Sequence, residues 1–295
     1  MANLHHKICT GIVCYKPDYL LLSPIINYFQ EQGVTVVLYL NSDLGNLHDL
    51  IIKGVVVLGA GNNDGIAKAH SELMHYAIRH SYSYMVVSDQ DTVYPENYIS
   101  SMKTFVDSFK EVTVVCPAWI NLNSETKCPE KQYVLETDRM VLKHAVYGDN
   151  LAHGISSGMF VVVDHIASKQ YIDEKLFIDW VDNDFCWSLI SSGHIIRYNA
   201  SVNLSHNLGD NVKKIGKVKL TTRPPIRDYY IVRNSLFLIL YRRYKIKVKS
   251  YLFVKFFSHI ILSLISSKSL VDFKERFFLL SKAIYHSLIR KLGSL

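Results

Sequence analysis

Two carboxylates stand where a short apolar run ends, in the segment Ser88-Asp-Gln-Asp-Thr92. The run before them, Tyr84-Met-Val-Val87, has the composition of a buried strand. Asp89 and Asp91 are therefore expected on one side of the chain and Gln90 on the other. Such a pair can share one hard cation, because Mg²⁺ or Mn²⁺ is held by one or two carboxylates together with substrate phosphates. The spacing indicates a metal site for a nucleoside diphosphate, with a solvated turn as the alternative.

Three more acids lie in Phe177-Ile-Asp-Trp-Val-Asp-Asn-Asp184, at the expected start of a helix. Acids at a helix N-terminus often serve as caps. Asp179 and Asp182, however, are three residues apart and can share a face. The rings of Trp180 and Trp187 are suited to stack on a sugar. The segment is thus a second place where chemistry is expected.

Two further segments could complete a site. Ile155-Ser-Ser-Gly-Met-Phe-Val-Val-Val163 is expected to be a buried strand, in which Gly158 allows close approach of the backbone to a ligand. Leu204-Ser-His-Asn-Leu-Gly-Asp210 follows a strand-like run and contains a lone imidazole, His206. A lone histidine is usually structural, so His206 is expected to matter only if the fold carries it to Asp91.

The elements that must position these residues follow a simple alternation. Strands are expected at 8–14, 34–39, 55–58, 84–88 and 112–116, and helices at 19–32, 66–80 and 96–109. This order predicts an α/β fold with a mixed, mainly parallel central sheet, helices on both faces and ligands at the carboxyl ends of the strands. Residues 121–149 are expected to be irregular.

Composition bounds the class of protein. With 295 residues and 49% hydrophobic content, the chain can form one large α/β domain and an appendage. Its five cysteines include no C-x-x-C pair, which favours a reducing compartment. The apolar run at 8–14 is too brief for a signal peptide. We therefore expect a cytoplasmic protein.

Positive charge is concentrated at the C-terminus. Residues 241–295 contain twelve Lys and Arg against Asp272 and Glu275, a balance of +10 within a net charge of +7, so the first 240 residues carry −3. The same segment is rich in Phe, Leu and Ile, but Lys255 and His259 interrupt it before the roughly 20 apolar residues of a membrane span. A tail that lies on an anionic membrane is expected.

The last helix of this tail has one apolar stripe with cations elsewhere around it. The stripe consists of Phe273, Phe277, Leu280, Ile284 and Leu288, and the cations are Lys274, Arg276, Lys282, Arg290 and Lys291. Amphipathicity alone also allows a helix that packs on the rest of the protein. No nucleic-acid recognition motif is found in the sequence.

Taken in order, these pieces resemble the family 2 glycosyltransferases of the GT-A fold, in particular the rhamnosyltransferase-like branch that builds bacterial surface polysaccharides. The resemblance covers roughly residues 7–240. It rests on the ordered set Cys14-Tyr-Lys-Pro-Asp18, Asn63-Asp-Gly-Ile-Ala-Lys-Ala69, Asp89-Gln-Asp91, Ser157-Gly158, Phe177 to Asp184, His206-Asn-Leu-Gly209 and Tyr229-Tyr-Ile-Val-Arg-Asn234. It implies a catalytic domain at 1–240, with a nucleotide-sugar half at about 1–120 and an acceptor half at about 121–240, and a helical tail at 241–295.

The resemblance also implies a reaction: metal-dependent, inverting transfer of a sugar from a nucleotide-sugar donor to a hydroxyl. Asp91 would bind Mg²⁺ or Mn²⁺ on the diphosphate, His206 would be a further ligand, and Asp182 would be the base. Arg233 would neutralise the departing diphosphate. The other implied contacts are Tyr15, Lys68, Asp89 and Gln90 to the donor, and Ser157, Gly158, Asp179 and Trp180 to the acceptor.

One position departs from the family pattern. Many relatives have an Asp before the Asn-Ser that follows strand two, where it reads the pyrimidine, but here Leu40 precedes Asn41-Ser42. Asp43 is a candidate substitute.

The donor expected first is L-rhamnose as its dTDP derivative, followed by galactose, galactofuranose or another hexose. The acceptor is expected to be a lipid-linked glycan of O-antigen, capsule or a related polysaccharide, which would place the protein peripherally on the cytoplasmic face of the bacterial inner membrane. Two other classes stay open: a catalytically inactive membrane-associated binding protein and a nucleotidyltransferase. The latter usually has a Gly-rich basic loop near its N-terminus, which Gly11-Ile-Val-Cys-Tyr-Lys16 does not supply.

Overall fold

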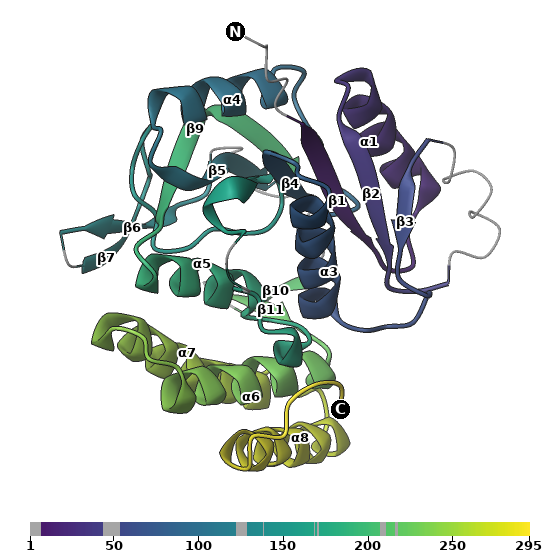
Figure 1. Ribbon diagram of the computed structural model, residues 1–295. Coiled ribbons are helices and arrows are strands. Elements are labelled where there is room, and N and C mark those ends of the chain that lie inside the picture. The colour runs from purple at the N-terminus through teal and green to yellow at the C-terminus, as the bar shows by residue number, and fades with distance from the viewer. Residues whose placement is uncertain are drawn as a thin grey trace, which may run out of the picture. The chain divides into compact units, whose positions relative to one another are not determined.

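The β-branched runs of the first half of the chain form one sheet in the computed structural model (Figure 1). The structure describes residues 7–43, 54–121, 129–137, 139–167, 169, 171–206, 211–215 and 218–295. The chain divides into two compact units. The first is Met1–Glu174 with Phe185–Leu208, and the second is Lys175–Asp184 with Gly209–Leu295.

The sheet of the first unit has seven strands in the order β3-β2-β1-β4-β8-β5-β9. They are β1 (Ile8–Cys14), β2 (Thr35–Leu40), β3 (Val56–Leu58), β4 (Tyr84–Ser88), β5 (Val112–Asn121), β8 (Met159–Val162) and β9 (Ile195–His206). Only β8 is antiparallel to its neighbours. The predicted mixed, mainly parallel sheet is confirmed. Because β1 to β4 are parallel, their carboxyl ends meet at one edge.

Helices cover both faces of this sheet. α1 (Tyr19–Glu31) and α4 (Tyr98–Ser108) contribute buried apolar side chains at helical spacing to one core cluster with the strands. α3 (Ile66–Arg79) packs on the other face. A Cβ added at Gly11 of β1 would lie 3.1 Å from the Leu73 side chain, so glycine lets α3 approach the strand closely.

Several elements differ from the expectation. β5 extends beyond the predicted 112–116, and the strand-like run before Leu204 continues through it as β9, because these two strands pair with each other along most of their length. The segment predicted to be irregular contains a hairpin of β6 (Gln132–Glu136) and β7 (Arg139–Lys143), and that prediction is wrong. A second hairpin, β10 (Asn211–Ile215) with β11 (Val218–Thr222), was not predicted. The acid-rich segment begins α5 (Val181–Ser191), as expected.

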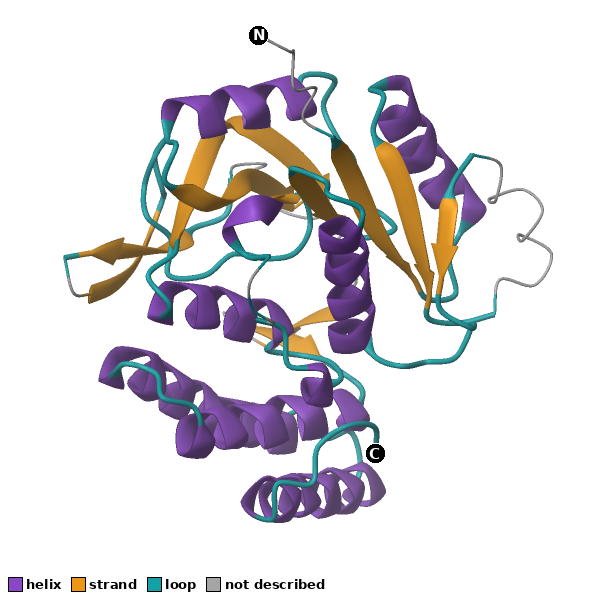
Figure 2. Cartoon of the chain, viewed as in Figure 1, coloured by secondary structure: helices purple, strands orange, loops and turns teal. Residues whose placement is uncertain are grey.

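The second unit is built mainly from three helices (Figure 2): α6 (Pro225–Tyr241), α7 (Ile246–Ile265) and α8 (Leu270–Leu288). Its core comprises Tyr229, Tyr230, Val232, Phe256, Leu280 and Ala283. A buried ion pair joins two of the helices, with Arg276 Nη1 2.7 Å from Asp228 Oδ2. Burial raises the pKa of Asp228, while hydrogen bonding from Ser263 and the charge of Arg276 oppose this shift.

The predicted apolar stripe of the last helix is divided between two environments. Leu280 is buried and Ile284 packs against the same core, whereas Phe273, Phe277 and Leu288 are exposed. α6, α7 and α8 belong to the same compact unit. The predicted domain boundary after residue 240 stays a prediction. By length and composition α7 could also cross a membrane, although it contains Lys255 and His259. Its mean hydropathy is 1.5, and 17% of its apolar window is buried. One such helix is weak support for a span.

Candidate functional site

The Asp-Gln-Asp segment lies in a turn directly after β4, beyond the strand itself. The Gln90 side chain contacts the end of β1. Its Oε1 accepts a hydrogen bond from the Tyr15 N–H (2.8 Å) and its Nε2 donates to the Tyr15 carbonyl (3.0 Å). The turn is thereby fixed to the neighbouring strand. Gln90 and Tyr15 are neighbours at the carboxyl edge, and their contact with a donor stays a prediction.

Asp89 is joined to the turn that precedes β8. The Ser157 hydroxyl donates a hydrogen bond to Asp89 Oδ2, so the observed partner of Ser157 is the turn after β4. The buried imidazole of His70, on α3, is close enough for the Asp89 carboxylate to raise its pKa, although burial is the larger effect and lowers that pKa to about 4. His70 is therefore neutral near pH 7. The sequence signal that could have indicated a buried His70 is its helical spacing from the apolar residues Leu73, Met74 and Ala77.

The structure explains the glycine at position 158 without the predicted approach of a ligand. Its φ is +72°, and an added Cβ would lie 2.1 Å from Leu204 Cδ1. Its carbonyl accepts a hydrogen bond from the Tyr98 hydroxyl at 2.8 Å. Packing and backbone conformation account for this glycine.

β9 brings the chain back to the turn that carries Asp91. Val93 and Ser205 exchange two backbone hydrogen bonds, and the next residue, His206, pairs in register with Asn121 of β5. The side chain of His206 and residues 207–210 lie outside the described part of the chain. Carboxylates with an imidazole form a ligand set that suits Mn²⁺ and tolerates Mg²⁺, so these residue types fit a divalent cation.

The end of β2 is bound to the start of α3. Asn41 Oδ1 accepts from the Asp64 N–H at 2.8 Å, and the Tyr39 hydroxyl donates to Asp64 Oδ2 at 2.8 Å. Lys68 Nζ lies 3.6 Å from the same Oδ2. The half-exposed Lys68 is thus held near the carboxyl ends of β1 and β2, where the nucleoside is predicted. Asp43 is exposed, and its reading of the base stays a prediction.

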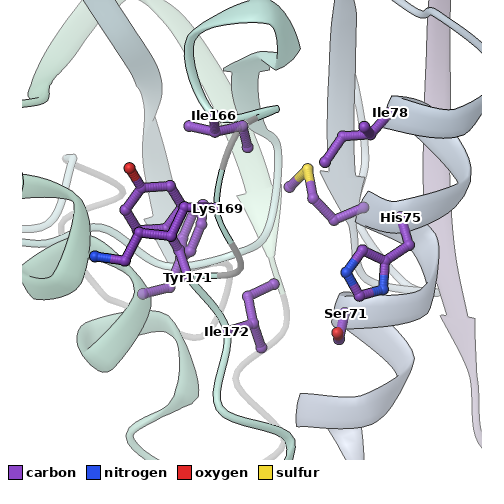
Figure 3. Close-up of a pocket in the computed structure, with 9 residues that line it drawn as sticks. Ser71, His75, Ile78, Ile166, Lys169, Tyr171 and Ile172 are labelled. Atoms are coloured by element: carbon purple, nitrogen blue, oxygen red, sulfur yellow. The ribbon is translucent and has the colours of Figure 1, made fainter.

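A separate pocket lies between α3 and the residues Ile166, Lys169, Tyr171 and Ile172 (Figure 3). Its lining is mainly apolar, with Ser71, His75, Lys169 and Tyr171 as polar members. Beside it, ligand atoms of Glu72, His75 and Glu174 lie within 4.8 Å of one another and could hold a metal ion. Glu174 also accepts a hydrogen bond from the Ser71 hydroxyl (2.7 Å). This second acidic group was not predicted.

The acids at the start of α5 have different surroundings. Asp182 is half-buried in the first turn, whereas Asp184 is 1% exposed, ion-paired with Arg242 at 3.2 Å and hydrogen-bonded by the Tyr244 hydroxyl. Asp179 Oδ1 lies 3.2 Å from Arg227 Nε. Asp184 is structural, and Asp182 is the acid of the first turn that keeps contact with solvent.

The sequence is similar to that of a characterised sugar transferase. The chain is 26% identical over 242 residues to the dTDP-rhamnosyl transferase RfbF of Shigella flexneri, which covers 80% of this chain and 81% of the relative. This similarity, together with the fold, supports a glycosyltransferase of the GT-A fold that is rhamnosyltransferase-like in sequence. No protein-family model matches it.

Solved structures agree on the fold of this glycosyltransferase. TarS of S. aureus superposes with a TM-score of 0.62 at 12% identity, covering 95% of this chain and 49% of TarS, so the chain spans about half the length of that protein. Its fragment 1–349 gives the same score, with 80% of the fragment covered. GalNAc-T7, crystallised with UDP, GalNAc and Mn²⁺, gives 0.56 at 11% identity and covers 88% of this chain and 57% of GalNAc-T7.

Two of the expected site roles need correction in this glycosyltransferase. The Arg233 side chain is fully buried, and it donates to the Gly293 carbonyl (2.6 Å), the Leu176 carbonyl (3.0 Å) and Asn234 Oδ1 (2.9 Å). Such an arginine is not placed to neutralise a departing diphosphate. Trp187 is 2% exposed, so it cannot stack on a sugar; Trp180 is partly buried and its indole N–H is bonded to the Ile231 carbonyl. The sequence motif that contains Arg233 gave no sign that this side chain is buried.

Proposed function

We propose that this glycosyltransferase moves a sugar, with L-rhamnose from dTDP-rhamnose as the first choice, to a hydroxyl of a lipid-linked glycan acceptor in O-antigen, capsule or a related surface polysaccharide. The observation that carries the proposal is the connected turn at Asp89 to Asp91, bonded to the ends of β1 and β8 and followed by Val93, which pairs with β9. It lies at the carboxyl edge of the sheet, where ligands of α/β folds bind. The similarity to a dTDP-rhamnosyl transferase supports the donor.

The first unit is proposed to hold the donor. Asp91 and His206 would bind Mg²⁺ or Mn²⁺, Asp89 would lie near the ribose, and Tyr15, Lys68 and Gln90 would line the nucleoside pocket. A bound divalent cation stabilises the negative charge that develops on the departing nucleoside diphosphate. The Mn²⁺ and UDP in the GalNAc-T7 structure support a metal-dependent reaction. The hydrogen bonds of Gln90 and Ser157 keep the turn in place for this role.

Asp182 is proposed as the base. An acceptor hydroxyl is protonated near pH 7, and a positioned carboxylate that takes its proton as the new bond forms contributes about 10²–10⁴ in rate. The N-terminus of α5 favours the ionised carboxylate that this step needs. Attack by a single activated hydroxyl from the face opposite the leaving group inverts the anomeric carbon. Asp179 and Trp180 are proposed to orient the acceptor.

The helices of the second unit are proposed to lie on the cytoplasmic surface of the inner membrane. α7 exposes Phe253, Val254, Phe257, Ile261 and Ile265 at helical spacing. Lys247, Lys249 and Lys255 of the same helix would contact anionic lipid headgroups. A lipid-linked acceptor would be reached from such a surface.

A donor screen tests the function. The protein is incubated with Mn²⁺ or Mg²⁺, a lipid extract from the producing cells and one radiolabelled sugar nucleotide at a time. The donors are dTDP-rhamnose, UDP-galactose, UDP-galactofuranose and other sugar nucleotides. Transfer of label from dTDP-rhamnose into the lipid fraction supports the first choice, and transfer from another donor replaces it. Binding of donors without any transfer identifies an inactive binding protein instead, and release of pyrophosphate identifies a nucleotidyltransferase.

A further inference from the structure

The segment that leads into α5 has an unusual backbone. Phe177, Asp179 and Trp180 have φ angles of 67°, 62° and 64°. Residues with a Cβ rarely adopt this left-handed region, because the Cβ crowds the following carbonyl oxygen. Such conformations persist only where the surrounding structure holds them, and they cluster at functional sites. Asp182, the proposed base, follows Trp180 by two residues.

The side chain of Asn234, on α6, holds this segment. Its Nδ2 lies 2.9 Å from the carbonyl oxygen of Leu176, 2.8 Å from that of Ile178 and 3.1 Å from that of Asp179. An amide NH₂ carries two hydrogens, which these carbonyls share. A carboxylate of the same shape would have no hydrogen to give and would repel all three oxygens.

Arg233 fixes the orientation of that amide. Its Nε donates to Asn234 Oδ1, which turns the NH₂ group toward the segment, and its Nη2 donates to the Leu176 carbonyl. Both side chains are fully buried. One turn earlier on α6, the Ile231 carbonyl accepts from the Trp180 indole at 3.0 Å.

We propose that Arg233 and Asn234 are positioning residues, which hold Phe177, Asp179 and Trp180 in their left-handed conformation and thereby fix the orientation of Asp182. The inference rests on the proposed function, because the orientation of Asp182 matters only if Asp182 is the base. It also gives the Tyr-Tyr-x-x-Arg-Asn element a role that does not require contact with the diphosphate. Misplacing a catalytic group by about 1 Å can cost about 10²-fold in rate.

The test compares Asn234→Asp with Ser235→Ala. Asn234→Asp keeps the shape and the oxygen that accepts from Arg233, but removes the donors to the segment. Ser235 is equally buried, and its hydroxyl donates to the Val232 carbonyl, so Ser235→Ala removes a buried hydrogen bond of α6 without altering the contacts of Asn234. We expect Asn234→Asp to lower kcat about 30-fold or more with donor KM within about threefold of wild type, and Ser235→Ala to lower kcat less than about twofold.

Equal kcat in the two variants would overturn the proposal, as would a donor KM that rises in step with the loss of kcat. If Asn234→Asp does not fold, Arg233→Lys takes its place, because it removes the guanidinium bonds to Leu176 and Asn234 while keeping the charge; an unchanged kcat then counts against the proposal. If the wild-type protein transfers no sugar, the proposed function fails on its own. Amide hydrogen exchange still decides the positioning role: faster exchange at residues 176–184 in Asn234→Asp but not in Ser235→Ala supports it, and equal exchange refutes it.

Discussion

Val93 and Ser205 are joined by two backbone hydrogen bonds, of 3.1 Å and 3.3 Å. Val93 is two residues beyond Asp91, and Ser205 immediately precedes His206. Backbone hydrogen bonds therefore join the turn after β4 to the end of β9. A metal site that uses Asp91 and His206 needs such a connection between segments more than 100 residues apart in sequence.

Loss of either proposed ligand should weaken binding of the nucleoside diphosphate only when the metal is present. Asp91→Asn and His206→Ala are each expected to raise the Kd for the nucleoside diphosphate about 10- to 100-fold in Mn²⁺, and by less than about threefold in EDTA. Isothermal titration with dTDP measures both. Glu174→Gln is the matched control, because it alters the other acidic group that could hold a cation. An equal loss in Glu174→Gln would assign the cation to that group.

The two acids in the first turn of α5 should differ when each is changed to its amide. Asp182→Asn is expected to lower kcat by about 10²–10⁴ with an unchanged melting temperature, because it removes a base at a solvent-accessible position. Asp184→Asn should instead lower the free energy of unfolding by about 2–4 kcal/mol, since it breaks the buried pairing with Arg242. Kinetics and thermal denaturation of both variants check this contrast. Full turnover in Asp182→Asn would remove Asp182 from its role.

The exposed apolar residues of α7 should govern binding to lipid. A variant with both Phe253→Ser and Phe257→Ser is expected to lose at least about tenfold in affinity for vesicles of phosphatidylglycerol and phosphatidylethanolamine, because two exposed aromatic side chains leave the interface. Vesicle co-sedimentation measures the change. Ile226→Ser, which alters an exposed apolar residue of α6, is the control. Binding that is unaffected by the double change, or that does not depend on anionic lipid, would exclude this surface as the membrane contact.

Much of the first unit could be predicted because its strands are locally encoded. β1 and β4 have the predicted limits, since each is a short, largely apolar run that ends at turn residues. The β6–β7 hairpin was missed because Gln132–Glu136 is short and only partly buried, so its alternation is weak. β8 begins later than expected, since residues before Met159 form the turn that presents Ser157 to Asp89.

The sequence indicates candidate site residues by their type, but it does not indicate how deeply each side chain is buried. Arg233 and Asn234 stand side by side in a recognisable motif, yet whether a guanidinium faces a ligand or a carbonyl depends on how α6 packs within its unit. The same holds for Asp182 and Asp184, which have the same residue type in one turn and differ in burial. His70 lacked any motif, because its relation to Asp89 exists only after α3 packs on the sheet.

Stability should fall on acidification between pH 6.5 and 4. Burial lowers the pKa of His70 to about 4, whereas in the unfolded chain it is about 6.5. The unfolded chain therefore binds more protons in this window, so the stabilising effect is complete above pH 6.5 and is lost as pH falls toward 4. The pKa of His259, in the second unit, is also lowered to about 4, chiefly by burial. Urea denaturation from pH 7 to 4 measures the slope, and His70→Gln should flatten it; an identical slope in that variant would show that His70 does not contribute.

Gly158 should tolerate a methyl group far less well than Gly193, although both have a positive φ, of +72° and +90°. At Gly193 nothing lies within 4 Å of an added Cβ, so alanine there adds backbone strain alone, about 1–2 kcal/mol. At Gly158 the same Cβ would lie 2.1 Å from Leu204 Cδ1 and 3.3 Å from Pro117 Cγ, which adds overpacking of about 1–3 kcal/mol. We therefore expect Gly158→Ala to destabilise the protein more than Gly193→Ala in urea denaturation. Combining Gly158→Ala with Leu204→Ala should cost less than the sum of the two single changes, because shortening Leu204 removes the clash. Strict additivity would show that the clash with Leu204 is not what makes glycine necessary at this position.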